Sequence, residues 1–218
     1  NRTVHASHYD VARVSRTIDP DPVRAWLGHQ SVSQFAAVEA RTGVRVVNPV
    51  GHLWVESPEG VSVLASADQR FNLGCVRRSA DETKAAFPFL SLDSGSTSRA
   101  GNLAVLDSLW EPPPAGSVDP RAHVRAETAA AVDAGATHLV ALVDGVVESS
   151  DGVTVASDQG TITADRVLLA TGAFSEHGIS PAAGLDLEYA LHAQLLVHLD
   201  AVEADRLAGL PSVIAKFA

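Results

Sequence analysis

The 218-residue sequence contains few of the residues that would suit nucleic-acid binding, a disulfide framework or a membrane span. Lys84 and Lys216 are the only lysines, and 16 basic against 26 acidic residues give a net charge of −10. Because an acidic chain repels phosphate backbones and no basic face is visible, we expect no nucleic-acid binding. The single cysteine, Cys75, excludes an internal disulfide and fits a reducing compartment. No apolar run approaches the roughly 18–20 residues of a membrane span, so we expect a soluble, cytoplasmic protein without membrane association.

Methionine is absent altogether, and the first residue is Asn1. Either the sequence is an internal piece of a longer protein, or methionine positions are missing from it and some spacings are compressed. The composition is otherwise that of a folded protein, with 46% hydrophobic and 19% charged residues. The length suits one large domain or two modest ones.

The beginning of the sequence predicts a long helix followed by short strands. Asp21 followed by proline is typical of a helix start, apolar residues then recur on one helical face, and Gly43 is a natural stop. β-like runs follow at 44–47 and 52–56, and a Ser-Pro-Glu-Gly turn signal at 57–60 ends the second run.

The middle of the sequence has weaker signals. Residues 80–86 predict a short helix, and the Ser- and Gly-rich stretch 91–102 predicts a loop. The proline-rich segment 111–116 is stiff and extended, so it cannot lie inside a helix or a central strand. We interpret it as a crossing between two structural regions.

The second half predicts an α/β layout. A helix is expected over 120–135, a strand over 138–143 and a three-stranded meander with tight turns over 146–163. The continuously apolar run 167–170 is typical of a strand buried on both faces. In open α/β sheets, ligands bind beyond the carboxyl ends of strands, so the small-residue turn at 170–173 is a candidate ligand-binding turn.

Four motifs then follow one another along the chain. They are GSVDPR at 116–121, a Gly-Ala pair at 135–136, the valine-rich meander, and ADRVLLATGAFS at 164–175. In this order they resemble the FAD-dependent amino-acid oxidase and sarcosine oxidase superfamily. SHYDVARVSR at 7–16 is similar to the segment that follows the first FAD-binding loops of sarcosine oxidases, with two arginines three residues apart.

The resemblance implies a Rossmann-like FAD-binding domain interleaved with an antiparallel-sheet substrate domain. Residues 1–42 and 116–178 would belong to the FAD-binding domain, and residues 43–115 and 179–218 to the substrate domain. In such enzymes a small amine or N-methyl amino acid loses a hydride to FAD, and the resulting imine is hydrolysed. Reduced flavin is then reoxidised by oxygen or by an acceptor protein, and the protein supplies orientation and electrostatic tuning.

The N-terminal match carries four residues into the expected site. Ser7 and His8 match positions next to the flavin. Arg13 and Arg16 match the paired arginines, of which one lies near the isoalloxazine ring and the other near the substrate carboxylate. We expect Arg13 to tune the flavin and Arg16 to orient a carboxylate, since a guanidinium can stabilise reduced flavin and hold a carboxylate in a bidentate pair.

The C-terminal match adds cofactor-binding positions. Val143 falls near a family position whose backbone meets the adenine. Ala170, Thr171, Gly172 and Phe174 match the turn against the flavin and its ADP side, with Phe174 standing where tryptophan is common.

Two departures from the family pattern affect the prediction. The sequence contains no G-x-G-x-x-G phosphate loop, which would hold the pyrophosphate at a helix N-terminus. The family's C-terminal third is absent too, and Lys216 comes too early to match its flavin-proximal lysine. We therefore expect a central piece of a longer flavoprotein that binds FAD poorly alone, and a non-catalytic scaffold or binding subunit remains an alternative, as does a dehydrogenase that uses a carrier instead of oxygen.

Other site types are weakly supported by the sequence. His5, His8 and Asp10 have metal-binding side chains but no third histidine or cysteine at a recognised spacing, so no metal site is predicted. No Gly-x-Ser-x-Gly elbow anchors a hydrolase triad. Cys75 has no His or Asp partner placed by the sequence, and we interpret it as a structural residue.

Overall fold

The computed structural model describes residues 6–10, 12–90, 106–172, 188 and 195–216. These residues fall into two compact units. Unit 1 combines residues 1–9 with 132–197, and unit 2 combines residues 10–131 with 198–218. The four-segment division into FAD-binding and substrate domains stays a prediction. Within the described residues, no helix has the length and apolar character needed to cross a membrane.

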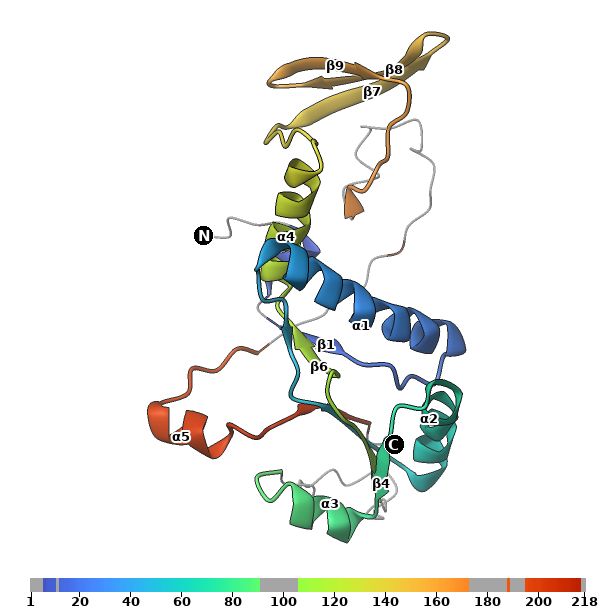
Figure 1. Cartoon of the computed structure of the whole chain (residues 1–218), viewed down its shortest axis with the longest axis vertical. Coiled ribbons are helices and arrows are strands. Elements are labelled where there is room, and N and C mark those ends of the chain that lie inside the picture. Colours follow the sequence, from blue (N-terminus) through green and yellow to red (C-terminus); the bar gives the residue numbers. More distant parts are fainter. Residues whose placement is uncertain (1–5, 11, 91–105, 173–187, 189–194, 217–218) are drawn as a thin grey trace. The chain divides into compact units, whose positions relative to one another are not determined.

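Unit 1 contains an antiparallel meander (Figure 1). Its strands are β7 (Val143–Ser149), β8 (Gly152–Ser157) and β9 (Gly160–Ala164), paired in sequence order. Short turns join them, as the Asp-Gly and Gln-Gly pairs predict. The predicted meander is therefore confirmed. A short 3₁₀ helix, η1 (Ser7–Tyr9), also belongs to this unit.

Two strands predicted for this part of the chain are not formed. Residues 138–142 have no regular structure and a strand begins only at Val143, while the apolar run 167–170 forms no strand. Val140 and Leu168 are 86% and 91% exposed. An apolar run becomes a buried strand only when neighbouring strands satisfy its backbone hydrogen bonds, and none of the described strands pairs with these two segments.

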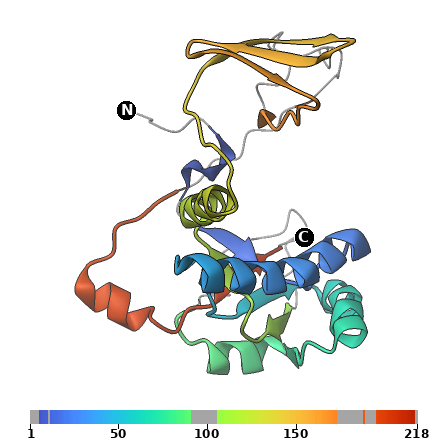
Figure 2. The same ribbon diagram turned by 45° about the horizontal axis from the view of Figure 1, so that its top comes forward.

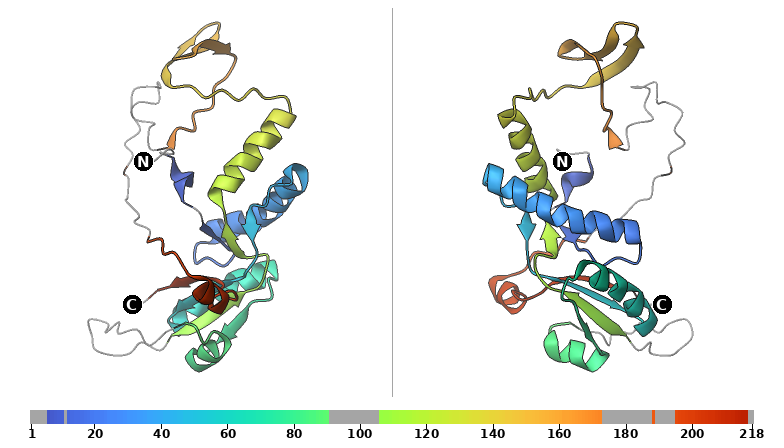
Figure 3. Two further views of the ribbon diagram at one scale, coloured as in Figure 1. Left: turned by 90° about the vertical axis from the view of Figure 1, so that its left-hand side faces the viewer. Right: turned by 45° about the vertical axis from the view of Figure 1, so that its right-hand side comes forward.

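In unit 2, a three-stranded sheet packs against two helices. The strands are β1 (Arg13–Ser15), β6 (Gly116–Val118) and β2 (Val47–Asn48), and both outer strands run antiparallel to the central β6. Val38 of α1 (Pro22–Thr42) and Ala126 of α4 (Pro120–Asp133) share a buried cluster with Val118. Figure 3 shows both helices beside these strands.

The predicted long helix is confirmed by its ends. Asp21 precedes α1 and accepts hydrogen bonds from the backbone N–H groups of Val23 and Arg24. Gly43 ends the helix in the left-handed conformation, at φ 68°, which glycine adopts without steric cost. The strand expected over 44–47 is shorter than predicted, because only Val47 and Asn48 pair with β6.

A four-stranded sheet forms the rest of unit 2 and is seen in Figure 2. Its order is β10 (Ser212–Ala215), β3 (His52–Glu56), β5 (Asp107–Glu111) and β4 (Val76–Arg78). β10 runs parallel to β3 and the other pairs are antiparallel. The segment 112–115 leads from β5 into β6, so the predicted proline-rich crossing joins the two sheets.

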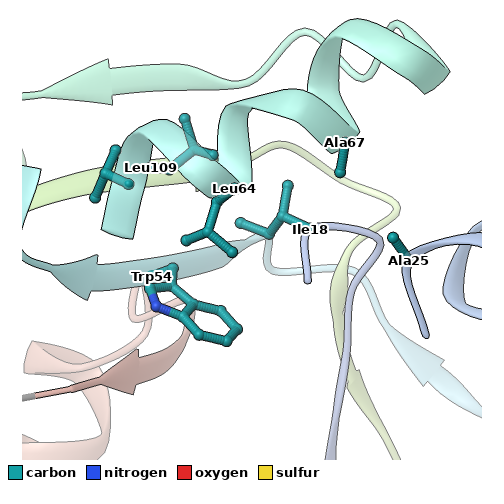
Figure 4. Close-up of a cluster of buried hydrophobic side chains, with 7 residues drawn as sticks. Ile18, Ala25, Trp54, Leu64, Ala67 and Leu109 are labelled. Carbon is teal, nitrogen blue, oxygen red and sulfur yellow. The ribbon is translucent and has the colours of Figure 1, made fainter. Parts of the chain in front are cut away.

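Successive side chains of β3 point to opposite faces of this sheet, and a different part of the chain packs on each face. Trp54 packs with Val61 and Leu64 of α2 (Pro58–Phe71), a cluster that Ile18 also enters (Figure 4). Leu53, on the other face, packs with the segment 87–90 that follows α3 (Ala80–Ala86). The short helix α5 (Ala201–Arg206) leads into β10.

The turn predicted at 57–60 is wrong, because these residues begin a helix. Ser57 is the N-cap of α2, its hydroxyl accepts the N–H of Gly60, and Pro58 occupies the first helical turn. Ser-Pro is a helix-start signal as well as a turn signal, and the apolar residues that distinguish the two lie further along the chain.

Candidate functional site

Strand register places a polar row across one end of the four-stranded sheet. Ser212 of β10 lies opposite His52 of β3, and His52 lies opposite Glu111 of β5. The next row on the same face is apolar, with Trp54 between Ile214 and Leu109. Ile18 lies against this face, beside Trp54 and Leu64 (Figure 4). The chain that precedes α1 therefore lies over the polar row.

Glu111 connects the polar row to that chain. Its carboxylate accepts hydrogen bonds from the backbone N–H groups of Thr17 and Ile18, each at 3.0 Å. Glu111 is only 4% exposed. Burial raises the pKa of its carboxyl group, while the two N–H donors and the nearby Arg16 guanidinium act in the opposite direction.

Arg16 directly precedes the two backbone groups that Glu111 binds. Its Nε donates to the carbonyl of Ile18 at 3.0 Å, and Nη2 lies 2.6 Å from a carboxylate oxygen of Asp19. The guanidinium carbon lies 4.9 Å from the ring centroid of Trp54, in a cation–π contact. A guanidinium has five N–H donors, and two of those of Arg16 are used in these hydrogen bonds. The remaining donors have no protein acceptor in the part of the chain that the structure describes, so they can receive a carboxylate.

His52 is a buried neighbour of this arginine. Burial, and secondarily the charge of Arg16, lower the pKa of His52 to about 3, so the ring is neutral at physiological pH. Nδ1 lies 3.0 Å from the hydroxyl of Ser212, which also donates to the carbonyl of Gly51. Because His52 is fully buried, this Ser-His-Glu row cannot present a nucleophile to substrate, and a hydrolase triad is excluded here.

Arg13 lies at the start of β1, where it pairs with Val118 of β6. Its Nε donates to the carboxylate of Asp10, and its side chain is half exposed, whereas Asp10 is buried. The pairing restricts the guanidinium while leaving part of it accessible. The role of Arg13 beside a flavin stays a prediction.

The other predicted cofactor residues belong to unit 1. Ser7 and His8 lie in η1, with Ser7 exposed, and Val143 is the first residue of β7. Residues 170–172 are exposed, and Phe174 lies outside the described residues. Arg13 and Arg16 belong to unit 2, so the structure does not test whether the two groups meet in one site.

The turn at Thr171 and Gly172 suits the approach of a flat ring system. Gly172 has φ 57°, and a Cβ added there would meet no atom within 4 Å. Its backbone is thus open on the side where a side chain would stand. Ser7 and His8 supply a hydroxyl and an imidazole to the same unit, and their role in binding a flavin nucleotide stays a prediction.

The sequence prediction missed Glu111, Trp54 and Asp19. In the sequence, Glu111 is distinguished only as the first residue of the proline-rich segment 111–116. A carboxylate at the end of a strand is a weak sign of a buried hydrogen-bond acceptor, and its partners lie 93 and 94 residues away. Asp19 could have been predicted from the sequence as a partner of Arg16, since an acidic residue three positions from an arginine often pairs with it.

A cavity of about 470 Å³ lies elsewhere in unit 2, between α1 and β2. Its lining is largely apolar and includes neither Arg13 nor Arg16. No group of three metal-binding side chains occurs among the described residues. Burial, together with the Asp68 carboxylate, raises the pKa of the Cys75 thiol, in agreement with a structural rather than a reactive residue.

Comparison with known proteins gives the class of this fold and then the family. The structure matches solved structures of an amino acid oxidase and an L-proline dehydrogenase, and a sequence model described as DAO, FAD dependent oxidoreductase, matches residues 3–212. The chain belongs to this family of FAD-dependent oxidoreductases. The mixed α/β fold predicted from the sequence is confirmed. Comparison with curated protein sequences found no match.

Three of the similar structures give the extent of the likeness. NikD, an unusual amino acid oxidase essential for nikkomycin biosynthesis, is 23% identical, with a TM-score of 0.60 over 82% of this chain and 44% of its own. The L-proline dehydrogenase from P. horikoshii is 21% identical, with a TM-score of 0.62 over 79% and 44%. A thermally stable mutant of fructosyl peptide oxidase is 17% identical, with a TM-score of 0.65 over 98% and 50%. The chain thus spans half or less of the length of these relatives.

Proposed function

We propose that this chain is part of an FAD-dependent enzyme that oxidises a C–N bond of a small amine or N-methyl amino acid, as sarcosine oxidases do. The observation that carries the proposal is Arg16, a guanidinium held by Ile18, Asp19 and Trp54 with N–H donors left for a ligand. Neighbours whose names describe amino-acid, proline and glycine oxidation support a substrate of this size.

In this proposal the protein residues bind and orient. Arg16 receives the substrate carboxylate in a bidentate pair and thereby fixes which C–H bond faces the cofactor. Arg13 provides positive charge beside the flavin, and Ser7, His8, Val143 and residues 170–174 contact the cofactor. FAD, when bound, supplies the hydride acceptor, and the substrate is left as an imine that water hydrolyses.

The first test uses the complete gene product. We expect it to be yellow and to lose its flavin absorbance when a small N-methyl amino acid is added without oxygen. A protein that is colourless and takes up no added FAD would contradict the proposal and would favour the alternative, a non-catalytic scaffold or binding subunit. Peroxide production during turnover distinguishes an oxidase from a dehydrogenase that passes electrons to a carrier.

The second test concerns Arg16 itself. We expect Arg16→Ala to raise KM for a carboxylate substrate about 100-fold, because a charged bidentate contact is lost, and Arg16→Lys to have an intermediate effect. Arg45→Ala, on an exposed arginine of the same unit, is the matched control. Equal KM values for the Ala variant of Arg16 and for the unmodified enzyme would refute the carboxylate role.

Location and partners are part of the same proposal. The single cysteine and the acidic charge favour the cytoplasm, and a small-molecule substrate is the expected partner. Nucleic-acid binding remains unexpected for a chain with a net charge of −10.

A further inference from the structure

The main chain at Arg16 is held from two directions within unit 2. On one side, the Glu111 carboxylate binds the N–H groups of the two residues that follow Arg16. On the other side, Gly28 of α1 lies so close that a Cβ there would collide with the carbonyl oxygen of Arg16. The backbone at Arg16 is therefore clamped between the end of β5 and a helix surface that admits only glycine.

The side chain of Arg16 is held separately. Ile18 and Asp19 accept its hydrogen bonds, and the Trp54 ring lies under the guanidinium. One of these acceptors belongs to a residue that Glu111 binds directly, since Ile18 supplies both its N–H to Glu111 and its carbonyl to Arg16, and Asp19 is the next residue along the chain. Loss of the Glu111 contact would therefore free the acceptor of Arg16 Nε as well as the backbone.

From this geometry we propose that Glu111 is a positioning residue for Arg16. Its buried carboxylate fixes Thr17 and Ile18, and through them it holds the guanidinium in the direction that receives a substrate carboxylate. Glu111 itself touches no substrate. The consequence for substrate binding rests on the function proposed above, whereas the positioning of Arg16 does not.

The chain offers a matched control at Glu39. That carboxylate also accepts two successive backbone N–H groups, from Val46 and Val47 at 2.6 and 2.7 Å. These hydrogen bonds hold the start of β2 and involve neither Arg16 nor the residues that contact it. A purely structural effect of losing such an acceptor should therefore appear equally in Glu39→Gln and Glu111→Gln.

The experiment measures Arg16 directly. In the complete, FAD-loaded protein with ¹⁵N-labelled arginine, the exchange rate of the Arg16 Nε–H with water is compared between variants by NMR. We expect Glu111→Gln to raise this rate at least 10-fold, because a neutral amide oxygen accepts the Thr17 and Ile18 N–H groups more weakly than a carboxylate, and its NH₂ group would face the Thr17 N–H that now also bonds the second carboxylate oxygen. We expect Glu39→Gln to leave it within 2-fold.

Ligand binding is the second readout. Calorimetric titration with benzoate, as a simple carboxylate, should show an affinity 10- to 100-fold weaker in Glu111→Gln, and KM should rise in parallel with kcat changed less than 3-fold. The double variant R16A/E111Q should bind benzoate no more weakly than R16A, since the positioning effect requires Arg16.

The outcomes separate the two proposals. An unchanged Nε–H exchange rate in Glu111→Gln, or an equal rise in Glu39→Gln, overturns the positioning role. Faster Nε–H exchange in Glu111→Gln supports the positioning role. If R16A nevertheless binds benzoate as tightly as the wild type, only the carboxylate-binding role of Arg16 is refuted. If Glu111→Gln does not fold, Gly28→Ala decides, because it displaces the Arg16 carbonyl from the opposite side and should accelerate the same exchange.

Discussion

At the scale of single residues, unit 2 buries polar groups that are satisfied mainly by the backbone. The buried Glu111 accepts two consecutive N–H groups, as does the half-buried Glu39, and the buried Asp19 combines the guanidinium of Arg16 with the N–H of Asp21. Buried acceptors of this kind are costly to leave unpaired, so they determine local chain direction as strongly as apolar packing does.

His52 gives a pH dependence whose sign follows from its environment. In the folded state its pKa is about 3, whereas in the unfolded chain it returns to its ordinary value near 6.5. Between these values the unfolded state binds the extra proton, so the free energy of unfolding should fall as the pH is lowered from 6.5 towards 3. The slope from this group is about 1.4 kcal/mol per pH unit.

Urea unfolding of the wild-type protein and of His52→Gln at several pH values checks this prediction. The stability difference between them should shrink as the pH falls, because only the wild type loses the contribution of a neutral buried imidazole. His138→Gln, which removes an exposed histidine, is the control and should keep a constant difference. If the free energies of unfolding of the wild type and of His52→Gln change in parallel with pH, protonation of His52 does not destabilise the folded state and the prediction is wrong.

The residue scale also limits what the sequence could predict. The two arginines three residues apart were found because their spacing resembles a family segment. Glu111 and Trp54 were not found, because their connection to Arg16 depends on the register of β3 and β5. Register is set by pairing between distant segments and is invisible in any local pattern.

At the scale of elements, helices with capping signals at their ends were predicted well. The start and stop of α1 follow from Asp21 and Gly43, and α3 and α4 occupy their predicted ranges to within two residues. Strands were predicted well only in the meander, where tight turns fix the pairing locally. The apolar runs at 138–142 and 167–170 carry a strand pattern, but a pattern alone does not supply hydrogen-bonding neighbours.

The cap of α1 provides a test at this scale. Asp21→Ala removes the acceptor for the N–H groups of Val23 and Arg24, and we expect a loss of about 1 kcal/mol in the free energy of unfolding. Ser33→Ala, in the exposed middle of the same helix, should have no destabilising effect, because alanine is the better helix former. Thermal or urea unfolding measures both. Equal effects of the two substitutions would show that the cap does not contribute.

At the scale of the whole molecule, unit 1 exposes large apolar side chains along its irregular segments. Leu139, Val140, Leu142 and Leu168 are 55% to 91% exposed. Large exposed apolar side chains favour association with other apolar surfaces when they gather in a patch. The 218-residue chain produced by itself should therefore bind an apolar fluorescent dye such as anilinonaphthalene sulfonate.

Substitution tests the origin of that dye binding. Val140→Ser combined with Leu168→Ser should lower the dye fluorescence several-fold without lowering the free energy of unfolding, since neither side chain is buried. The matched control is Val63→Ser, on an apolar residue of unit 2 that is 53% exposed. Unchanged fluorescence in the double variant would place the dye elsewhere on the molecule.

The hydrogen bonds between Glu111 and the chain after Arg16 also affect the order of events during protein synthesis. They join residues 93 and 94 positions apart, so a ribosome adding 5–20 residues per second incorporates this segment about 5–20 s before Glu111. Throughout that interval the arginine segment has no acceptor for its two N–H groups. Arg16 is therefore translated well before the carboxylate that fixes the chain beside it.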